Sequence, residues 1–221
     1  MIRLSLPPGR ALLAAAIVSL CTLTAPFASA ADKATPPAGK GPATGKAAPT
    51  AGAPQDAMME AMMKFATPGP EHAVLNPLVG KWKGVTKMWM APGDPTVSEG
   101  TVDRSWVMGG RYLVAKHTGE FGGMPFEGME VLGYDKMHGM YVSTWIDNMG
   151  TGIGMSEGGV WDASAKTLTV KMSFDDPVTG QKTAFRNVTK IVDDNTHVFS
   201  MIGVKDGKDF TQMETTYTRI P

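Results

Sequence analysis

The chain has 221 residues, of which 43% are hydrophobic and 19% are charged, and its formal net charge at pH 7 is zero. This length fits one domain with appended segments. A balanced charge gives no electrostatic attraction toward nucleic acid or an anionic membrane surface. Cys21 is the single cysteine, so the composition also excludes a disulfide framework and a thiolate metal site.

The N-terminus has the three parts of a secretory signal peptide. Arg3 and Arg10 form a basic start, and residues 11–23 are an apolar run that is short for a membrane span. Residues 28–30 (Ala-Ser-Ala) are a small-residue cleavage site. We therefore expect an exported protein, periplasmic or secreted, without an integral membrane segment after signal cleavage. Cleavage would also remove Cys21 and leave a small net negative charge.

Residues 31–56 consist mostly of Ala, Pro and Gly and contain no aromatic or branched aliphatic residue. Such a segment cannot bury enough apolar surface to offset the entropy of ordering, so we expect a disordered linker. Strong helix formers follow Asp56, a suitable N-cap, and predict a short helix that ends near Phe65. Its methionines share one broad face, which we interpret as packing on the next domain, with a Cu(I) site as the alternative. Residues 71–79 predict one or two further turns.

From residue 80 onward, short segments rich in β-branched and aromatic residues alternate with Gly, Asp and Asn turns. No stretch has sustained helical periodicity, so neighbouring strands should form antiparallel hairpins. Closure of such a sheet removes its exposed edges. The predicted fold is therefore an all-β, ten-stranded up-and-down antiparallel barrel, with a β-sandwich as the rival. The predicted strands span residues 81–90, 98–107, 111–121, 125–134, 139–147, 151–161, 166–174, 182–192, 197–204 and 208–219.

Glycines and turn residues add local detail to this prediction. Asp206 and Gly207 are typical of a two-residue type I′ hairpin turn. The segment 151–161 contains four glycines, which is unusual inside a strand. We interpret them as a sharp bend of the barrel, and a close ligand contact is the alternative.

Gly80, Lys81 and Trp82 open the first strand after a short helical turn, and Arg219 ends the last strand. This arrangement resembles the lipocalin and calycin signature, in which the Trp closes one barrel end and an Arg packs over it. The resemblance implies structural roles for Trp82 and Arg219, and we expect the two side chains to lie in contact.

Seven further stretches are typical of one particular family: 68–72 (PGPEH), 78–82 (LVGKW), 109–113 (GGRYL), 123–128 (GMPFEG), 133–135 (GYD), 144–147 (TWID) and 193–197 (DDNTH). Together they resemble domain-of-unknown-function family 1579, an uncharacterised bacterial family with a lipocalin-like barrel. The resemblance covers about residues 58–219. It implies the barrel fold and carries over no reaction, because the family has none assigned.

The candidate pocket residues are aromatic side chains and polar side chains on strands that are otherwise apolar, because small-molecule pockets combine apolar walls with a few polar groups. A one-residue slip would turn every side chain to the other face, so the sequence does not decide which of them point inward. The candidate ligand-binding residues are Trp106, Arg111, Tyr112, His117, Phe126, Trp145, Arg186 and Glu214.

The sequence gives little support for catalytic or metal chemistry. No two of the four histidines have the local spacing of a metal site, so we predict neither a metal nor another cofactor. Haem held by His117 or His197 is the alternative. The chain has no nucleophile elbow, P-loop or dinucleotide fingerprint, and we assign no catalytic residue. The carboxylates of Glu127, Glu130 and Asp147 are interpreted as solvated surface groups rather than an acid–base pair.

We therefore expect an exported barrel that binds a small, largely apolar ligand and no nucleic acid. Two other readings remain open. One is an enzyme that acts on a hydrophobic substrate in the barrel mouth, with His117 or Glu214 as its base. The other is a structural envelope protein without a ligand. The expected organisation is a signal peptide (1–30), a disordered linker (31–56), short helices (57–79) and the barrel (80–221).

Overall fold

The structure, a computed structural model, describes residues 53–91, 93–175, 180–205 and 207–221. The predicted signal peptide, most of the predicted linker and Asp206 of the predicted hairpin turn lie outside these residues. The elements are α1 (Ala53–Ala66), α2 (Pro70–Ala73), the 3₁₀ helix η1 (Asn76–Leu78), β1 (Gly80–Met88), β2 (Thr96–Val107), β3 (Tyr112–Phe121), β4 (Met124–Asp135), β5 (Met140–Asp147), β6 (Gly154–Asp162), β7 (Thr167–Asp175), β8 (Lys182–Asp193), β9 (Thr196–Lys205) and β10 (Lys208–Arg219).

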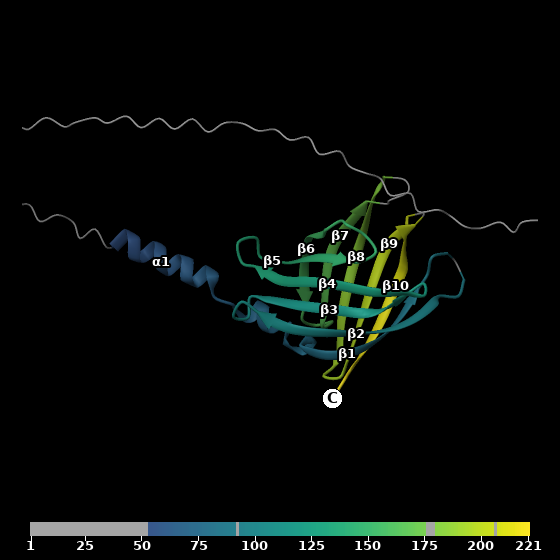
Figure 1. The fold of residues 1–221 in the computed structure, drawn as a ribbon. Coiled ribbons are helices and arrows are strands. Elements are labelled where there is room, and N and C mark those ends of the chain that lie inside the picture. The colour runs from purple at the N-terminus through teal and green to yellow at the C-terminus, as the bar shows by residue number, and fades with distance from the viewer. Residues whose placement is uncertain (1–52, 92, 176–179, 206) are drawn as a thin grey trace, which may run out of the picture. The chain divides into compact units, whose positions relative to one another are not determined.

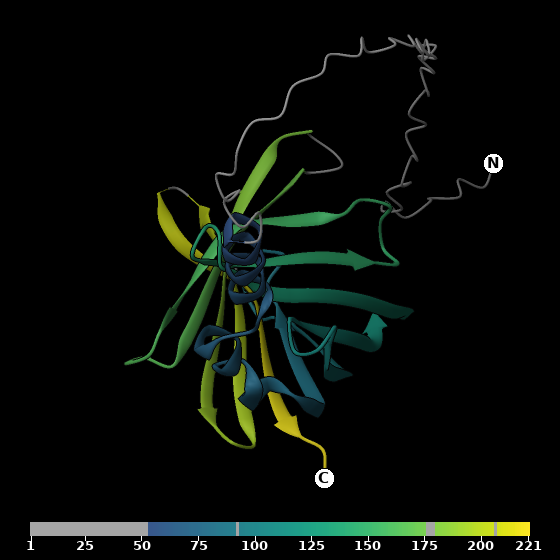
Figure 2. The ribbon, with the colours of Figure 1, turned by 90° about the vertical axis from the view of Figure 1, so that its left-hand side faces the viewer.

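The ten strands form one closed barrel in which consecutive strands lie side by side (Figure 1). The first strand, β1, pairs antiparallel with both β2 and β10 and so closes the sheet. Figure 2 shows the same strands after a 90° turn, arranged around a common interior. The predicted fold class is therefore confirmed, and the sandwich is excluded. Each strand lies within a few residues of its predicted range.

The helix α1 begins at Ala53, a little before the predicted N-cap Asp56. Its four methionines, Met58, Met59, Met62 and Met63, are each more than half exposed, so the expected packing of this face on the barrel is wrong. The helix is instead tied at its C-terminal end, where Lys136 donates a hydrogen bond to the carbonyl oxygen of Lys64 (3.3 Å). No helix in the described ranges is long and apolar enough to cross a membrane.

The glycine-rich sixth strand contains a β-bulge. The pairing register between β6 and β7 shifts between Ser156 and Gly158. Gly158 has a φ of +121°, which a residue with a side chain would adopt only with strain. A Cβ at Gly152, just before the strand, would meet nothing within 4 Å. These observations favour the interpretation of the glycines as a bend of the barrel.

Residues 70–79, which we call the plug, close one end of the barrel. Leu75 is fully buried and Leu78 is 5% exposed, and both pack in a cluster with Leu113, Leu132 and Leu168 of the barrel wall. Burial of these leucines stabilises the α2–η1 segment against the barrel although a proline interrupts it.

Hydrogen bonds from aromatic side chains fix the plug to the strands. The indole of Trp82 is 1% exposed and donates from Nε1 to the carbonyl oxygen of Leu78 at 2.9 Å. The hydroxyl of Tyr141 donates to the carbonyl oxygen of Glu71 at 2.8 Å. The guanidinium of Arg219 lies over the Trp82 ring, so the predicted contact between these two side chains is present.

Candidate ligand-binding site

A cavity of about 500 Å³ occupies the barrel interior. It reaches the surface at the end opposite the plug, where the lining residues Glu120, Phe121 and Met149 are exposed. Most of the wall is apolar and comes from several strands, including Leu113, Leu132, Val170, Met172, Phe174 and Phe199.

The strand registers decide which side chains face the cavity. On β3 the lining residues are Leu113, Ala115 and His117, and on β10 they include Thr215 and Tyr217. These positions alternate along each strand, as expected when one face of a sheet points inward. The sequence leaves the inward face of each strand undecided. The lining residues identify that face for every strand that carries a candidate residue.

Three of the candidate ligand-binding residues line the cavity and lie together in one aromatic wall. The ring of His117 meets the Trp145 ring edge-on at a centroid distance of 5.2 Å. Phe126 stacks against the same indole, with ring centroids 6.4 Å apart. Gly128 permits this arrangement, because a Cβ there would lie 2.7 Å from the Trp145 ring.

Three other candidates lie near the plug or at the surface rather than in the cavity lining. Trp106 has the inward parity but donates from Nε1 to Asn76 Oδ1 of the plug at 2.9 Å. Arg111 lies in the turn before β3, where its guanidinium donates to the carbonyl oxygen of Met108 at 2.8 Å. Tyr112 has the outward parity and is 40% exposed.

The last two candidates, Arg186 and Glu214, have the outward parity and do not line the cavity. Arg186 forms a surface ion pair with Asp209 (2.6 Å), and both side chains are well exposed. Glu214 alternates with the lining residues Met213 and Thr215. Of the two bases considered for an enzyme, only His117 therefore faces the cavity.

Polar side chains from five strands gather around the plug end of the cavity, and sequence reasoning missed two of them, Arg104 and Tyr217. We call this group the deep polar cluster, and its members are Arg104, His117, Glu130, His197 and Tyr217. The interpretation of Glu130 as a solvated surface carboxylate is wrong, because its side chain lines the cavity. The available signal was its parity, since Glu130 shares a face of β4 with Phe126 and Leu132.

The hydrogen bond between Arg104 and His197 fixes the tautomer of the histidine. Arg104 Nη1 lies 2.9 Å from His197 Nε2. A guanidinium can only donate, so Nε2 must accept and the ring proton must reside on Nδ1. The imidazole is 1% exposed, meets the Trp82 ring edge-on at 4.3 Å and stacks on Tyr217 at 4.6 Å. Within the described residues, His197 Nδ1 has no hydrogen-bond partner.

Burial dominates the electrostatics of the cluster. Burial first, and the positive charge of Arg104 second, lower the pKa of His117 to about 3 and the pKa of His197 to about 2. Burial also raises the pKa of the Glu130 carboxyl and of the Tyr217 hydroxyl, with Arg104 acting in the opposite direction on each. At neutral pH the two imidazoles and the phenol are therefore uncharged.

The model of the family described as "Protein of unknown function (DUF1579)" matches residues 67–219, which is most of the chain. The chain belongs to the DUF1579 family. The family resemblance identified from the sequence is thereby confirmed. No curated protein matches the chain.

Two solved structures that are similar to this DUF1579 protein are distant from it in sequence. Rv2717c from M. tuberculosis is 16% identical with a TM-score of 0.52, and the match covers 70% of this chain and all of Rv2717c. The S-type phycobiliprotein lyase CPES from Guillardia theta is 10% identical with a TM-score of 0.47, over 72% of this chain and 97% of the lyase. At these identities the likeness to Rv2717c shows a shared fold and nothing more.

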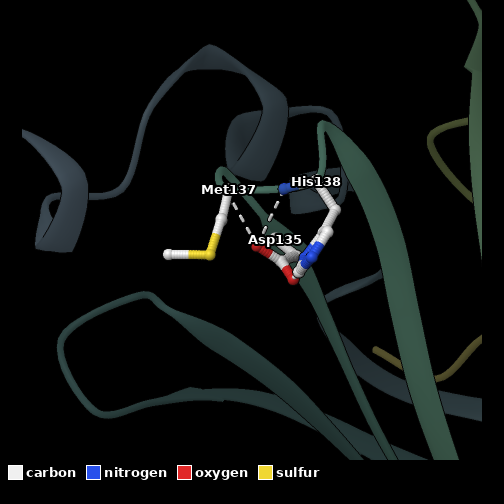
Figure 3. A network of polar contacts seen from close by, with 3 residues as sticks. All are labelled: Asp135, Met137 and His138. Carbon is white, nitrogen blue, oxygen red and sulfur yellow. Dashed lines mark hydrogen bonds and ion pairs between the residues drawn. The ribbon is translucent and has the colours of Figure 1, made fainter.

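Two further histidines of the DUF1579 barrel, His72 and His138, lie away from the cavity lining. His72 is buried in the plug, where its Nδ1 accepts a hydrogen bond from the main-chain nitrogen of Gly69 (3.1 Å). His138 lies in the exposed β4–β5 turn that Figure 3 shows. There Asp135 accepts hydrogen bonds from the main-chain nitrogens of Met137 (2.8 Å) and His138 and from the His138 ring (2.6 Å). These bonds lower the pKa of Asp135 and organise the turn.

Three observations describe the metal-ligating and basic side chains in and around the cavity. In the described part of the chain, no group of three or more His, Cys, Asp or Glu side chains could hold a metal ion. Of the two histidines considered for haem, His197 uses Nε2 to accept from Arg104, whereas His117 Nε2 is buried without a hydrogen-bond partner in the described residues. A pKa of about 3 makes His117 a weak base at neutral pH.

Proposed function

We propose that this protein binds a small, largely apolar ligand inside the barrel. The cavity carries the proposal: its volume of about 500 Å³ lies within the range of about 300–1,000 Å³ typical of ligand pockets. Its walls are largely apolar, and the lining also includes polar side chains, among them Arg104 and Glu130 toward the plug end. A barrel with a structural role alone would be expected to fill this space with side chains.

We further propose that the protein is exported and acts in the periplasm or outside the cell. The signal-like residues 1–30 support this, and so does the Ala-, Pro- and Gly-rich segment that follows them. N-terminal sequencing of the protein isolated from its own host should find a chain that starts at Ala31. A chain that retains residues 1–30 in the cytoplasm would contradict the proposed export.

Purification from the native host provides the direct test of ligand binding. The full chain, examined by native mass spectrometry, should show a mass excess that disappears after extraction with organic solvent. The extract should contain one compound or one chemical series. A protein that carries no extractable molecule, and that also fails to bind a neutral fluorescent dye, would contradict the proposal.

Two tryptophan substitutions on β9 localise the binding site. Met201 lines the cavity, whereas Val204 on the same strand is 71% exposed. Met201→Trp should fill part of the cavity and weaken binding of the neutral dye N-phenyl-1-naphthylamine by at least about tenfold, since the added ring occupies ligand volume. Val204→Trp should bind the dye as the wild type does. Equal binding by both variants would place the dye outside the barrel.

A further inference from the structure

Arg104 carries a positive charge into the deep end of the cavity. Its side chain lines the cavity, although the residue is only 7% exposed. The guanidinium donates to His197 Nε2 at 2.9 Å and lies 4.8 Å from the centroid of the Tyr217 ring. Neither partner is an anion, and among the described residues no carboxylate forms an ion pair with this guanidinium. Arg104 is therefore a buried cation without a direct counter-ion.

Glu130 is the carboxyl group that faces Arg104 from across β3. In the strand registers Arg104 lies opposite Ala115, and Ala115 lies opposite Glu130, so the three residues form one row across the barrel wall. The charge of Arg104 favours the ionised carboxyl, but burial outweighs it and raises the pKa of Glu130. No ion pair joins the two side chains, so the Glu130 carboxyl group is not a direct counter-ion of Arg104.

The other groups that face this row do not supply a compensating charge. His117 on β3, His197 on β9 and Tyr217 on β10 are uncharged at neutral pH because burial disfavours their charged forms. Glu120 on β3 and Asp147 on β5 also line the cavity, but they lie near the strand ends at its mouth. An anion that reaches the deep end would thus meet a guanidinium that has no other direct counter-ion.

We infer that the ligand is an amphiphile. Its carboxylate head binds Arg104, and its apolar tail lies along the aromatic wall formed by His117, Phe126 and Trp145. Binding is accompanied by the uptake of one proton from solvent by Glu130. This inference names the ligand class for the proposed function and rests on it. The planar guanidinium matches a carboxylate in two parallel hydrogen bonds. A second negative charge beside Glu130 would repel the ionised carboxyl in this poorly solvated space, and protonation removes the repulsion.

The head-group preference can be measured by competition. Decanoate, decan-1-ol and decyltrimethylammonium share a ten-carbon chain and differ in charge, and each is titrated against N-phenyl-1-naphthylamine bound to the full chain at pH 7. Decanoate should displace the dye at a concentration at least about tenfold below decan-1-ol, and the ammonium compound should be the weakest. Equal displacement by decanoate and decan-1-ol would overturn the inference and leave the proposed function standing. Failure of the dye and of all three competitors would overturn the proposed function itself.

Substitution of Arg104 tests the assigned counter-ion. In Arg104→Gln the ratio of the decanoate affinity to the decan-1-ol affinity should fall to about one. This ratio is the readout because a substitution that weakens the binding of both compounds equally leaves it unchanged. Arg104→Lys keeps the charge but loses the planar fork, and it should retain part of the preference. Arg186→Gln, which removes a surface guanidinium, should keep the wild-type ratio. An unchanged ratio in Arg104→Gln would overturn the inference. If Arg104→Gln does not fold, the inference is tested by the affinity ratio of Arg104→Lys and by the competition experiment on the wild type.

Proton uptake by Glu130 gives a second, independent readout. Between pH 8 and pH 6, where decanoate stays ionised, its affinity should rise on acidification, while the affinity of decan-1-ol stays constant. Neither buried histidine contributes in this range, because the pKa of His117 is about 3 and that of His197 about 2. Glu130→Gln should bind decanoate more tightly than the wild type at pH 8 and lose the slope. A wild-type affinity that is independent of pH, or a slope that survives in Glu130→Gln, would overturn the proton uptake.

Discussion

The guanidinium of Arg219 covers the indole of Trp82 at the closed end of the barrel, with its central carbon 4.0 Å from the ring centroid. The same guanidinium donates hydrogen bonds to three main-chain carbonyl oxygens, those of Pro77 (2.9 Å), Val79 (2.7 Å) and Asp194 (2.8 Å). Arg219 therefore joins the plug, the β8–β9 turn and the end of β10 around one buried ring. The contact is a structural junction rather than part of the cavity.

Substitutions in this junction should lower the unfolding free energy according to the contacts that each one removes. Trp82→Ala deletes a buried ring and should cost about 3–5 kcal/mol of unfolding free energy. Arg219→Ala removes the cation–π contact and three charge-assisted hydrogen bonds and should cost about 2–4 kcal/mol. Arg219→Lys should recover only part of that loss, because an ammonium keeps the positive charge but lacks the planar geometry of the guanidinium. Denaturant unfolding of the three variants measures these values. A wild-type midpoint for Arg219→Ala would show that the contact contributes nothing.

The plug should depend measurably on the hydroxyl of Tyr141. This residue is 4% exposed and donates to the carbonyl oxygen of Glu71, so Tyr141→Phe leaves a carbonyl oxygen without its partner. The expected loss is about 0.5–1.5 kcal/mol in denaturant unfolding. Tyr112→Phe is the matched control, because Tyr112 is 40% exposed, and it should change stability by less than about 0.5 kcal/mol. Equal effects of the two substitutions would contradict a specific role for the hydrogen bond.

The barrel could be predicted from the sequence because the patterns that specify its strands and turns lie in short, continuous segments of the chain. Turn residues separate short strand-like segments, and hairpin connections leave few topologies to choose from. The cavity could not be predicted in the same way, because parity is decided by pairing across the whole sheet. Arg186 and Glu214 were candidates by residue type and lie outside, whereas Arg104 and Glu130 lie inside. Trp106 illustrates a second limit, since its contact with the plug joins residues that are distant in the sequence.

The buried histidines should make folding sensitive to mild acid. Burial lowers the pKa of His117 and His197 to about 3 and about 2, whereas in the unfolded chain each titrates near its ordinary value of about 6.5. Below pH 6.5 the unfolded state therefore binds more protons than the folded state, and stability falls as the pH falls. Each histidine should contribute a loss that approaches about 1.4 kcal/mol per pH unit.

Unfolding by urea between pH 7.5 and pH 5 measures this slope. His117→Gln and His197→Gln should each flatten it by the share of one histidine, and the double variant should flatten it further. Glu130 acts with the opposite sign, because its raised pKa favours the folded state on acidification, but it is present in all four proteins and cancels in the comparison. A slope in the double variant equal to that of the wild type would contradict neutral, buried imidazoles.

Gly128 should control the shape of the aromatic wall. The Trp145 ring lies so close to this glycine that an added Cβ would be 2.7 Å from it, and the indole is held there by a hydrogen bond from Nε1 to Asp147 Oδ2 (2.6 Å). Gly128→Ala therefore forces the ring toward the cavity or away from Asp147. We expect a loss of about 1–3 kcal/mol in unfolding free energy and a weaker affinity for N-phenyl-1-naphthylamine.

Gly152→Ala is the matched control for this substitution, because a Cβ at Gly152 would meet nothing within 4 Å. It should change neither the unfolding free energy beyond about 0.5 kcal/mol nor the dye affinity. Tryptophan fluorescence adds a readout of the ring itself, since a displaced Trp145 should shift the emission of Gly128→Ala and not that of Gly152→Ala. If Gly128→Ala keeps the wild-type emission, stability and dye affinity, then the wall is more adaptable than the close contact between Gly128 and Trp145 indicates, and the ligand cannot depend on the position of that ring.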